Sequence, residues 1–446
     1  RKKIDNYQYD TLQLARSLYF DQPVFNLSAL SEYFDLSSKG AHRAESDTEN
    51  TGLIFLKLID EISSYPLEII SKVNSLIKGS GIPNQQLYIN LGNELTKKGD
   101  LKSGLINSDN FKRMNHNSFQ SHGNNSILDI SAEQVFGPEG LLSGIHPNFE
   151  YRSNQEKYAK MVDDILNDSQ KIGVIEAGTG LGKSMSYLFG AIRRSVNFEE
   201  NGPTIIACHT KHLQDQLFHK DLPLLSQALN VPLKAVILKG RKNYICKTKL
   251  SWLFSDVRTL DGIDIEALIP IIFWMHWTTT GDISECSGFF NARRNWLKSL
   301  ICSDTGFCTG DICNRHDGCF YGKLKRKIFH SHIIVVNHSL LMTDVVQKGI
   351  LPSYTSVIID EAHNLVKSAY DQFKMEWSEQ KVLYQIQTVD PSFPRSSRWN
   401  NILQSINDIN SDVGRHREKL KIAVENTRSC LKIFMEGLTE QNETRF

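Results

Sequence analysis

The sequence has almost no net charge, no long apolar run and few cysteines for its length. With 51 Lys and Arg against 50 Asp and Glu, its formal net charge is +1, so it lacks the whole-molecule basic field that marks many nucleic-acid-binding proteins. The sequence contains no apolar run of membrane-spanning length, and Arg1–Ile4 lacks the pattern of a signal peptide. Eight cysteines in 446 residues do not suggest a secreted disulfide scaffold. Together these features favour a cytoplasmic enzyme with no membrane partner.

Four of the cysteines have the spacing of a metal site. Cys308, Cys313 and Cys319 are separated by four and then five residues, and Cys246 lies far upstream. Thiolates grouped in this way select zinc or an iron–sulfur cluster. Cys302, six positions before Cys308, is the one rival ligand. The alternative is that these are buried thiols without a metal, because free cysteines often pack as small hydrophobic residues.

A glycine-rich segment at residues 177–184 has the pattern of a phosphate-binding loop. It follows Ile172–Ile175, which we predict to be a buried parallel strand, and it precedes a predicted helix at Met185–Ile192. Glycines let the backbone turn tightly and direct amides at phosphate oxygens, and the helix N-terminus adds its dipole. Lys183 would then reach the β- and γ-phosphates, and Ser184 would ligate magnesium. The residues expected to line the nucleotide phosphates are Ala177, Gly178, Thr179, Gly180, Leu181, Gly182, Lys183 and Ser184.

A second apolar run, Val357–Ile359, leads into two adjacent carboxylates. Asp360 and Glu361 begin an Asp-Glu-Ala-His box at the carboxyl end of the predicted strand, where open α/β sheets bind ligands. We expect Asp360 to hold magnesium through water and Glu361 to orient and deprotonate the attacking water, because phosphoryl transfer depends on positioning and charge neutralisation. An acidic helix start after a strand is the alternative, but the phosphate loop upstream argues against it.

Apolar runs alternate with helical patterns between residues 127 and 365, which predicts an α/β domain with a parallel sheet wrapped by helices. The cysteines fall within or beside an insertion at residues 247–330. Residues 63–126 are interpreted as a helical spacer followed by a polar linker, and residues 366–446 turn helical and polar. The expected strands are Ile172–Ile175, Thr204–Ala207, Ala235–Leu238, Ile333–Val336 and Val357–Ile359.

The phosphate loop, the cysteines and the Asp-Glu-Ala-His box together resemble the DinG/XPD-type superfamily 2 DNA helicases that carry a 4Fe–4S cluster. The cysteine spacing is closer to the bacterial DinG branch. Tyr151–Gln155 resembles the family's adenine-reading stretch, which implies base contacts by Arg152 and Gln155. Gly240–Cys246 resembles the lead-in to the first cluster cysteine, and Leu213–Leu217 belongs to a segment that resembles the family's DNA-backbone contact.

This resemblance implies a RecA-like P-loop NTPase fold with a helical iron–sulfur insertion, followed by the start of a helical arch domain at residues 366–446. It implies ATP, Mg²⁺ and a 4Fe–4S cluster as cofactors, and single-stranded and forked DNA as partners of an expected monomer. ATP hydrolysis would drive 5′→3′ movement on DNA, in repair or replication. Two alternatives stay open: a nuclease that the ATP site regulates without unwinding, and a zinc-bearing DNA-binding module with a decayed ATP site.

Residues 1–62 resemble the closing third of a DnaQ-like 3′–5′ exonuclease, which has an RNase H-like fold. The resemblance rests on the segments Leu27–Phe34 and Gly40–Asp47 and on the helix that follows. It implies His42 as the general base and Asp47 as a ligand of a two-metal Mg²⁺ or Mn²⁺ site. The alternative is a surface histidine and aspartate near a helix start. The resemblances imply further metal-binding acidic residues upstream for the exonuclease. They also imply a second motor domain downstream for the helicase. We therefore expect this chain to be a fragment that is inactive by itself.

Overall fold

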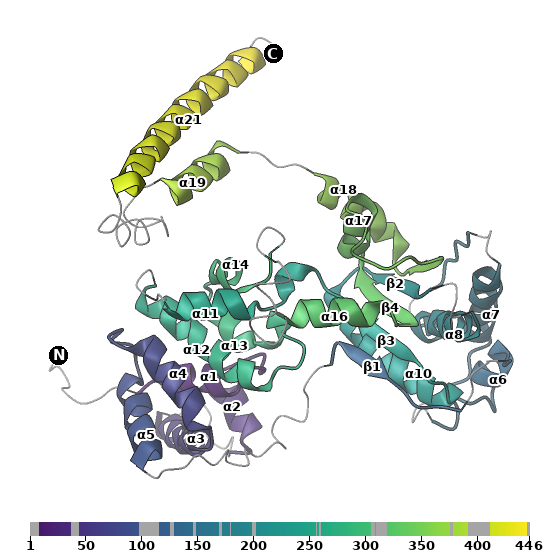
Figure 1. The fold of residues 1–446 in the computed structure, drawn as a ribbon. Helices are drawn as coiled ribbons and strands as arrows, with labels where there is room; N and C mark the ends of the chain where they lie inside the picture. The colour runs from purple at the N-terminus through teal and green to yellow at the C-terminus, as the bar shows by residue number, and fades with distance from the viewer. Residues whose placement is uncertain are drawn as a thin grey trace. The chain divides into compact units, whose positions relative to one another are not determined.

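The structure is a computed structural model that divides into two compact units, Arg1–Gln372 and Phe373–Phe446 (Figure 1). The residues described are 9–36, 44–97, 116–124, 129–145, 149–168, 172–178, 180–198, 202–255, 257, 260–304, 308, 319–374, 378–390 and 411–443. None of the helices within these ranges combines the length and the apolar character needed to cross a membrane.

A five-stranded sheet in the order β1-β3-β4-β2-β5 is the centre of one half of the first unit. β2 (Thr204–Cys208), β3 (Lys234–Ile237), β4 (Ile333–Asn337) and β5 (Ser356–Ile359) are parallel. β1 (Ser118–Gln120) pairs antiparallel with β3. This mostly parallel sheet confirms the predicted RecA-like α/β class. The predicted polar linker includes residues 118–120, and this part of the prediction is wrong because they form an edge strand of the sheet.

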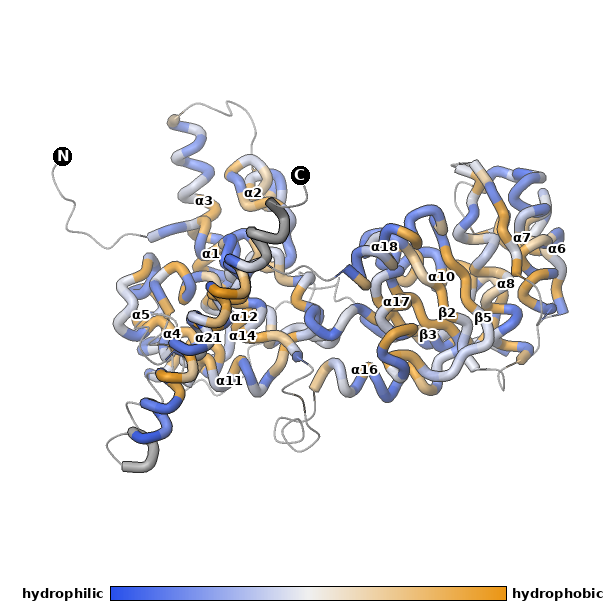
Figure 2. The backbone as a smooth tube through the Cα atoms, turned by 90° about the horizontal axis from the view of Figure 1, so that it is seen from above, coloured by the Kyte–Doolittle hydropathy of each residue, from blue (hydrophilic) through white to orange (hydrophobic). Residues whose placement is uncertain are grey.

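Alternating residues of the strands supply two hydrophobic cores, one on each face of the sheet. Ile206, Ala235 and Val335 face a core built with α6 (Ala132–Phe136), α7 (Ser153–Asn167), α8 (Lys183–Asn197) and α10 (Leu222–Leu229). Ile205, Val236 and Val336 face a second core built with α16 (Phe320–Ile328) and α17 (His338–Val346). Because both faces are covered, the central strands are continuous apolar runs, as Figure 2 shows for β2 and β3.

The predicted strand at Ile172–Ile175 does not form, and this expectation is wrong. The side chains of Ile172 and Val174 are 95% and 94% exposed, and residues 172–178 make no ladder with the described strands. The segment lies against α7 instead, where a Cβ at Gly173 would meet Ile165 Cδ1 at 2.2 Å. An apolar run becomes a strand only when a neighbouring strand accepts its backbone hydrogen bonds, and sequence alone does not supply that neighbour.

The other half of the first unit is helical and has one hydrophobic core. Helices from the N-terminal region and helices from the cysteine-bearing insertion both contribute to it. Ser287 Oγ and Gly288 N–H both donate to the Phe20 carbonyl, each at 2.9 Å, and Trp277 Nε1 donates to the Tyr65 hydroxyl at 3.1 Å. The helices are α1 (Thr11–Leu18), α2 (Leu27–Tyr33), α3 (Ala44–Ser63), α4 (Leu67–Ile77), α5 (Gln85–Lys97), α11 (Lys247–Ser255), α12 (Gly262–Trp277), α13 (Ser287–Asn291) and α14 (Leu297–Ile301).

This shared core joins regions that the sequence divided at residues 62 and 126. α12 is apolar around most of its circumference, and ten of its residues are buried. A helix of this kind needs cover on all sides, and α1, α4 and α13 provide it. The assignment of residues 1–62 to an exonuclease domain stays a prediction.

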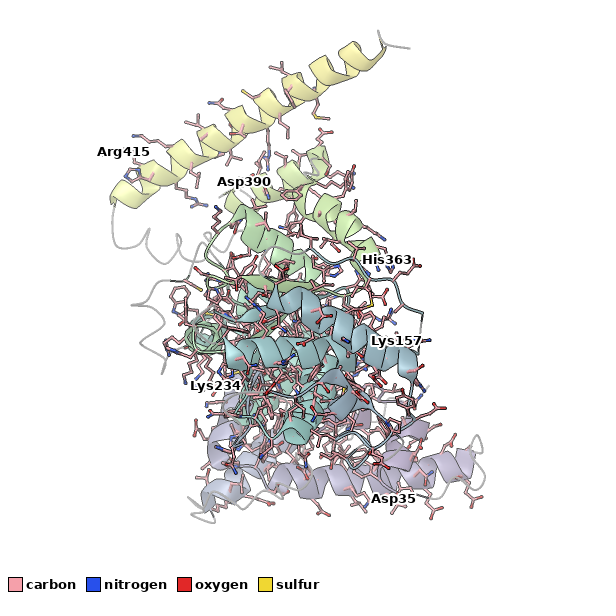
Figure 3. All side chains as sticks on the ribbon, turned by 90° about the vertical axis from the view of Figure 1, so that its right-hand side faces the viewer. Asp35, Lys157, Lys234, His363, Asp390 and Arg415 are labelled. Atoms are coloured by element: carbon pink, nitrogen blue, oxygen red, sulfur yellow. The ribbon has the colours of Figure 1, made fainter. Side chains whose placement is uncertain are left out.

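The second unit consists of α19 (Glu379–Val389) and the long helix α21 (Ser411–Glu443). Ile386, Val424 and Leu431 form its small core. Beside this core, Arg428 Nη2 lies 2.7 Å from Asp390 Oδ2, and the Asp390 side chain is 3% exposed. Figure 3 labels Asp390 after α19 and Arg415 on α21. α18 (Leu365–Phe373), predicted as the start of the arch, ends at the boundary between the two units.

Candidate functional site

The phosphate-loop residues form a turn that only glycine accommodates well. Gly180 and Gly182 have φ values of +79° and +87°, in the left-handed region that L-residues with side chains rarely adopt. A Cβ at Gly182 would also meet Gln155 Nε2 at 2.4 Å. Gly182 is the N-cap of α8, so the first amides of that helix emerge at Lys183 and Ser184. Such amides, together with the helix dipole, form a phosphate cradle. Thr179 lies outside the described residues.

The Asp-Glu-Ala-His box meets this loop at the carboxyl end of the sheet. The Asp360 N–H donates to the Ala207 carbonyl at 2.9 Å, which holds the end of β5 beside the end of β2. Glu361 then takes a left-handed φ of +52°. Its Oε1 lies 3.3 Å from Lys183 Nζ, and its Oε2 lies 3.5 Å from His363 Nδ1. Residues 178 positions apart are therefore in contact, at the edge where α/β sheets bind ligands.

Tyr187 and His338 also hold Asp360, and the sequence reasoning missed both. The Tyr187 hydroxyl donates to Asp360 Oδ2 at 3.1 Å, and its side chain is 2% exposed. Burial raises the pKa of Tyr187 well above its ordinary value, and the Asp360 charge adds to the effect, so the hydroxyl remains a donor. His338 Nε2 lies 2.9 Å from the Asp360 carbonyl oxygen. The available signals were the i, i+4 spacing of Tyr187 from Lys183 and the place of His338 just after β4.

The two predicted base-contacting residues lie against the phosphate loop. Arg152 Nη1 donates to the Gly180 carbonyl, and its Nη2 lies 2.7 Å from Glu150 Oε2. Gln155 Nε2 donates to the Gly182 carbonyl at 3.2 Å. Both side chains therefore support the turn through its carbonyl groups. Their contact with an adenine base stays a prediction.

Replacing Tyr187 with phenylalanine is expected to weaken the magnesium dependence of nucleotide binding. Loss of one hydrogen bond to a carboxylate costs on the order of 1 kcal/mol, so the Mg²⁺ concentration for half-maximal binding should rise roughly fivefold. A titration of a fluorescent ATP analogue with Mg²⁺ measures this change. Tyr158→Phe is the matched control, because burial and then the Asp360 charge raise the Tyr158 pKa but its hydroxyl makes no bond to that carboxylate. Equal Mg²⁺ curves for Tyr187→Phe and the unmodified protein would refute this role.

Three of the four predicted metal-ligating cysteines lie within the described residues, and Cys313 lies outside them. The Cys246 N–H donates to the Ile301 carbonyl at 2.7 Å, which fixes this buried cysteine beside the end of α14. The Cys308 sulfur lies 3.3 Å from Ser303 Oγ. Cys319 is the N-cap of α16, and its sulfur accepts the Gly322 N–H at 3.0 Å.

The three described thiols lie in one neighbourhood. Burial raises the pKa of Cys246, with a smaller contribution from the nearby Cys308. The pKa of Tyr321 is raised by burial and, to a lesser degree, by Cys319 and Cys308, so these two sulfurs lie near the same ring. Within the described ranges, no three Cys, His, Asp or Glu side chains come close enough together to hold a metal ion. The four-thiolate set therefore stays a prediction.

The rival cysteine, Cys302, is held differently. Its backbone pairs with Ile245 in an isolated antiparallel bridge, and its side chain is 3% exposed. Burial raises the pKa of the Cys302 thiol to about 12, so this side chain is a neutral thiol at pH 7. Cys246 is also buried and its pKa is also raised by burial, so these properties alone do not separate Cys302 from the predicted ligand.

One of the two predicted exonuclease residues, Asp47, lies within the described residues. Asp47 lies in the first turn of α3, where it is half-buried, and its carbonyl accepts the Thr51 hydroxyl at 2.7 Å. His42 lies outside the described residues. The roles of both residues in a two-metal site stay a prediction.

Several characterised proteins are similar to this chain in sequence, although no family model matches it. The ATP-dependent DNA helicase YoaA of Escherichia coli (strain K12) is 33% identical over 258 residues, which are 56% of this chain and 38% of that protein. The 3'-5' exonuclease DinG of Bacillus subtilis (strain 168) is 28% identical over 378 residues, 81% of this chain and 38% of the relative. The protein of the same name from Staphylococcus aureus (strain bovine RF122 / ET3-1) is 26% identical over 443 residues, 98% of this chain and 46% of the relative.

The chain spans less than half the length of each of these relatives. The similarities agree with the mostly parallel sheet and with the phosphate loop that meets a carboxylate pair at its edge. These similarities support a helicase family of the DinG type for this chain.

Proposed function

We propose that this chain carries the ATP site of a DNA helicase in which ATP hydrolysis drives 5′→3′ movement on single-stranded DNA. The observation that supports it best is the contact between the phosphate loop and the carboxylate pair, with Lys183 Nζ 3.3 Å from Glu361 Oε1. The similarity to the ATP-dependent DNA helicase YoaA of Escherichia coli supports ATP and DNA as the substrates. The direction of movement and a 4Fe–4S cluster held by Cys246, Cys308, Cys313 and Cys319 follow from the sequence resemblance.

Each side chain of the site has a separate role in ATP hydrolysis. Bound MgATP supplies the phosphoryl group and the divalent charge. Lys183 neutralises phosphate charge, and the amides at the start of α8 orient the phosphate oxygens. Asp360 holds the metal's water, and three elements fix its position through Tyr187, His338 and Ala207. Glu361 takes the proton of the attacking water, because its left-handed backbone directs the carboxylate to the loop.

Lys183→Ala is expected to weaken MgATP binding about 10- to 100-fold, because a hydrogen bond to a charged group contributes roughly 1.5–3 kcal/mol. Equilibrium titration with a fluorescent ATP analogue measures the loss. Lys234→Ala is the control, since Lys234 begins β3 at the opposite end of the parallel strands (Figure 3). Equal affinity in Lys183→Ala and Lys234→Ala would contradict the assignment of the nucleotide site.

A 3′–5′ exonuclease that the ATP site regulates is the second candidate function. The names of the Bacillus and Staphylococcus relatives favour it, and one of their alignments covers 98% of this chain. In this case His42 and Asp47 would serve a two-metal site with Mg²⁺ or Mn²⁺.

Unwinding and degradation assays on a chain extended to the length of its relatives separate the two functions, because the 446-residue chain is expected to be inactive by itself. Duplexes with a 5′ or a 3′ single-stranded tail are incubated with and without ATP, and one set carries exonuclease-resistant phosphorothioate ends. A helicase displaces the strand of the 5′-tailed, protected duplex only when ATP is present, and Lys183→Ala loses this activity. Shortening of unprotected 3′ ends without displacement of the protected strand would support the regulated nuclease instead.

A further inference from the structure

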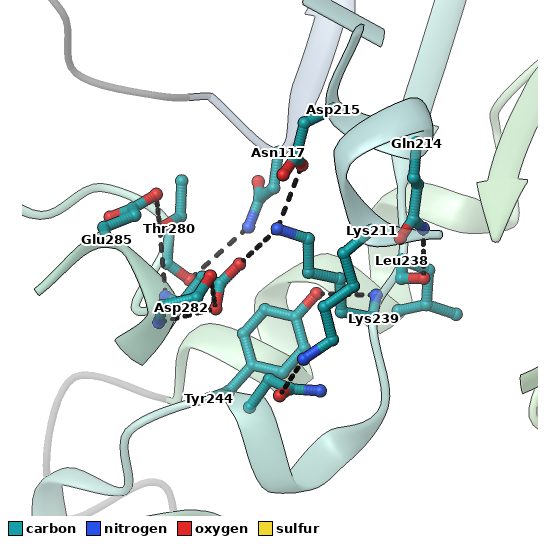
Figure 4. Close-up of polar contacts among 12 residues, drawn as sticks. Asn117, Lys211, Gln214, Asp215, Leu238, Lys239, Tyr244, Thr280, Asp282 and Glu285 are labelled. Atoms are coloured by element: carbon teal, nitrogen blue, oxygen red, sulfur yellow. Dashed lines mark hydrogen bonds and ion pairs between the residues drawn. The ribbon is translucent and has the colours of Figure 1, made fainter. Parts of the chain in front are cut away.

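A buried lysine joins the two halves of the first unit through two carboxylates. Lys239 follows β3, and its side chain is buried. Its Nζ lies 3.0 Å from Oδ1 of Asp215 on α9 (Lys211–Gln216), which packs on the sheet, and 2.8 Å from Oδ2 of Asp282 in the cysteine-bearing insertion. Figure 4 shows the ammonium group between these two side chains. One cation therefore holds the insertion to the sheet-based half at this junction.

A third carboxylate, Glu285, lies in the same junction and is held by neutral groups. It is the last residue of a short 3-10 helix, Ile283–Glu285, which begins just after Asp282. The Thr280 hydroxyl donates to Glu285 Oε1 at 2.6 Å. The Thr278 hydroxyl and Trp274 Nε1 donate to Oε2 at 3.1 and 3.3 Å. These bonds fix the carboxyl group, but they do not neutralise a charge on it.

A cavity of about 20 Å³ lies among these charged groups. This volume is close to that of one water molecule. One ammonium group and three carboxylates line it, so negative groups outnumber positive ones when all four are ionised. Carboxylates enclosed together favour the binding of a proton by one of them. The charged and titratable side chains of the lining are His116, Asp215, His219, Lys239, Tyr244, Asp282 and Glu285.

Glu285 is the carboxyl group best placed to hold this proton. Burial raises the pKa of Glu285 to about 7; the hydrogen bond from Thr280 opposes the rise and the Asp282 charge adds to it. Asp215 and Asp282 both lie against the Lys239 ammonium group instead. Burial acts to lower the pKa of Lys239, but the Asp282 and Asp215 charges outweigh burial and raise it, so this cation stays charged.

Three other titratable groups near Glu285 are neutral at pH 7. Burial lowers the pKa of His219, on the π-helix Leu217–Asp221. Burial raises the pKa of Tyr244 and that of Cys286, and the Glu285 charge adds to both effects. Glu285 is therefore the group of this junction whose charge changes near neutral pH, and exposed His116 is tested separately below.

We propose that this junction is a proton-controlled latch: Asp282 holds the insertion to Lys239 while Glu285 is protonated, and the latch loosens when Glu285 releases its proton to solvent. The new negative charge then repels Asp282. Asp215 keeps its contact with the same ammonium group, so Lys239 stays charged when the insertion moves away. This inference concerns how the two halves are held together, and it does not depend on the proposed helicase activity.

The direction of the pH effect follows from the two pKa values of Glu285, which are 4.5 ordinarily and about 7 in the folded protein. Between these values the folded junction holds a proton that the open junction has released. The closed junction therefore loses stability as the pH rises through this window, and its stability levels off above pH 7. Between pH 6 and pH 8.5 the open fraction should rise roughly tenfold, as one proton with these two pKa values requires.

The test is hydrogen–deuterium exchange of the 446-residue chain at pH 6 and pH 8.5, corrected for the intrinsic pH dependence of amide exchange. The stretches 239–246 and 278–286 should lose protection roughly tenfold between the two pH values. Glu285→Gln is nearly isosteric and cannot titrate, so both stretches should have equal protection at the two pH values. Lys239→Met removes the cation of the latch, so both stretches should be poorly protected at either pH.

Thr280→Val provides a second variant with a different signature. It removes the hydrogen bond to Glu285 Oε1, which favours the charged carboxylate, so the pH at which protection is lost should rise by about one unit. Damage to packing alone would lower protection at every pH without moving this midpoint. Glu266→Gln is the matched control, because Glu266 lies on α12 and burial raises its pKa too, but it does not line the cavity. His116→Gln and His219→Gln should also keep the tenfold loss.

Each outcome decides for or against the latch. Equal protection of the two stretches at pH 6 and pH 8.5 in the unmodified chain overturns it. A pH-dependent loss that persists in Glu285→Gln also overturns it, because the proton then belongs to another group. If Glu285→Gln does not fold, Thr280→Val decides, and an unmoved midpoint in that variant rejects the latch. A loss that Glu285→Gln abolishes and the control variants retain supports the proposal.

Discussion

Replacing Glu361 with glutamine is expected to lower ATP turnover about 10²- to 10⁴-fold, the usual contribution of a general base, while MgATP binding is nearly unchanged. Glutamine has the size of glutamate and still offers an oxygen to Lys183 Nζ, which lies 3.3 Å from Glu361 Oε1. It cannot take a proton from water. The left-handed backbone at residue 361 is equally accessible to both side chains, so the geometry of the loop should persist.

Steady-state ATP hydrolysis with and without single-stranded DNA, by a chain extended to the length of its relatives, measures the loss, and a fluorescent ATP analogue measures binding. Glu68→Gln is the control, because Glu68 lies on α4 and its surface carboxylate lies 2.6 Å from Lys72 Nζ. Turnover by Glu361→Gln within tenfold of the unmodified protein would assign the proton transfer to another group. A parallel loss of binding would show that the residue acts on the nucleotide itself.

Replacing Cys246 with serine is expected to abolish iron binding. The unmodified chain, purified without air, should carry about four iron and four sulfide per molecule, as a cluster with four thiolate ligands requires. Serine cannot supply a soft thiolate at this buried position beside Ile301. The same loss is expected for Cys308→Ser, Cys313→Ser and Cys319→Ser.

Cys302→Ser is the matched control because Cys302 is a neighbouring buried thiol. Cys302 lies outside the four-cysteine set that the sequence resemblance implies, so this variant is expected to retain iron. Iron and acid-labile sulfide analysis, with visible absorption spectra of the same samples, measures the outcome. Stoichiometric zinc without iron in the unmodified protein would show that the site is a zinc site. Loss of iron from Cys302→Ser but not from Cys308→Ser would show that Cys302, and not Cys308, is the ligand.

The meeting of the phosphate loop with the carboxylate pair could be predicted from the sequence. The glycines at 180 and 182 and the carboxylates after β5 are local patterns that indicate one phosphate site. The route to the meeting differs from the prediction, because the expected strand at Ile172–Ile175 does not form and the loop reaches the site at the start of α8. The burial of β2 and β4 could also be predicted, because a strand with a continuous apolar run needs cover on both of its faces.

Other features depended on contacts between distant segments. The run Ile172–Ile175 has the composition of a strand but lies against α7 without a ladder, because composition does not specify a hydrogen-bonding neighbour. Ser118–Gln120 has the composition of a linker but forms β1, because β3 offers it a free edge. In both cases the presence or absence of a neighbouring strand, and not the local composition, decided whether a strand formed.

The sequence by itself determined which residues can handle phosphate and metal, because glycine, lysine and adjacent carboxylates have these properties wherever they lie. Tertiary structure alone decided which side chains support them. Tyr187 reaches Asp360 only because α8 packs beside the end of β5, and Lys239 reaches Asp282 only because the insertion folds back against the sheet. Tertiary structure also joined the N-terminal helices to the insertion, because the apolar circumference of α12 must be covered and the chain supplies that cover from more than one side.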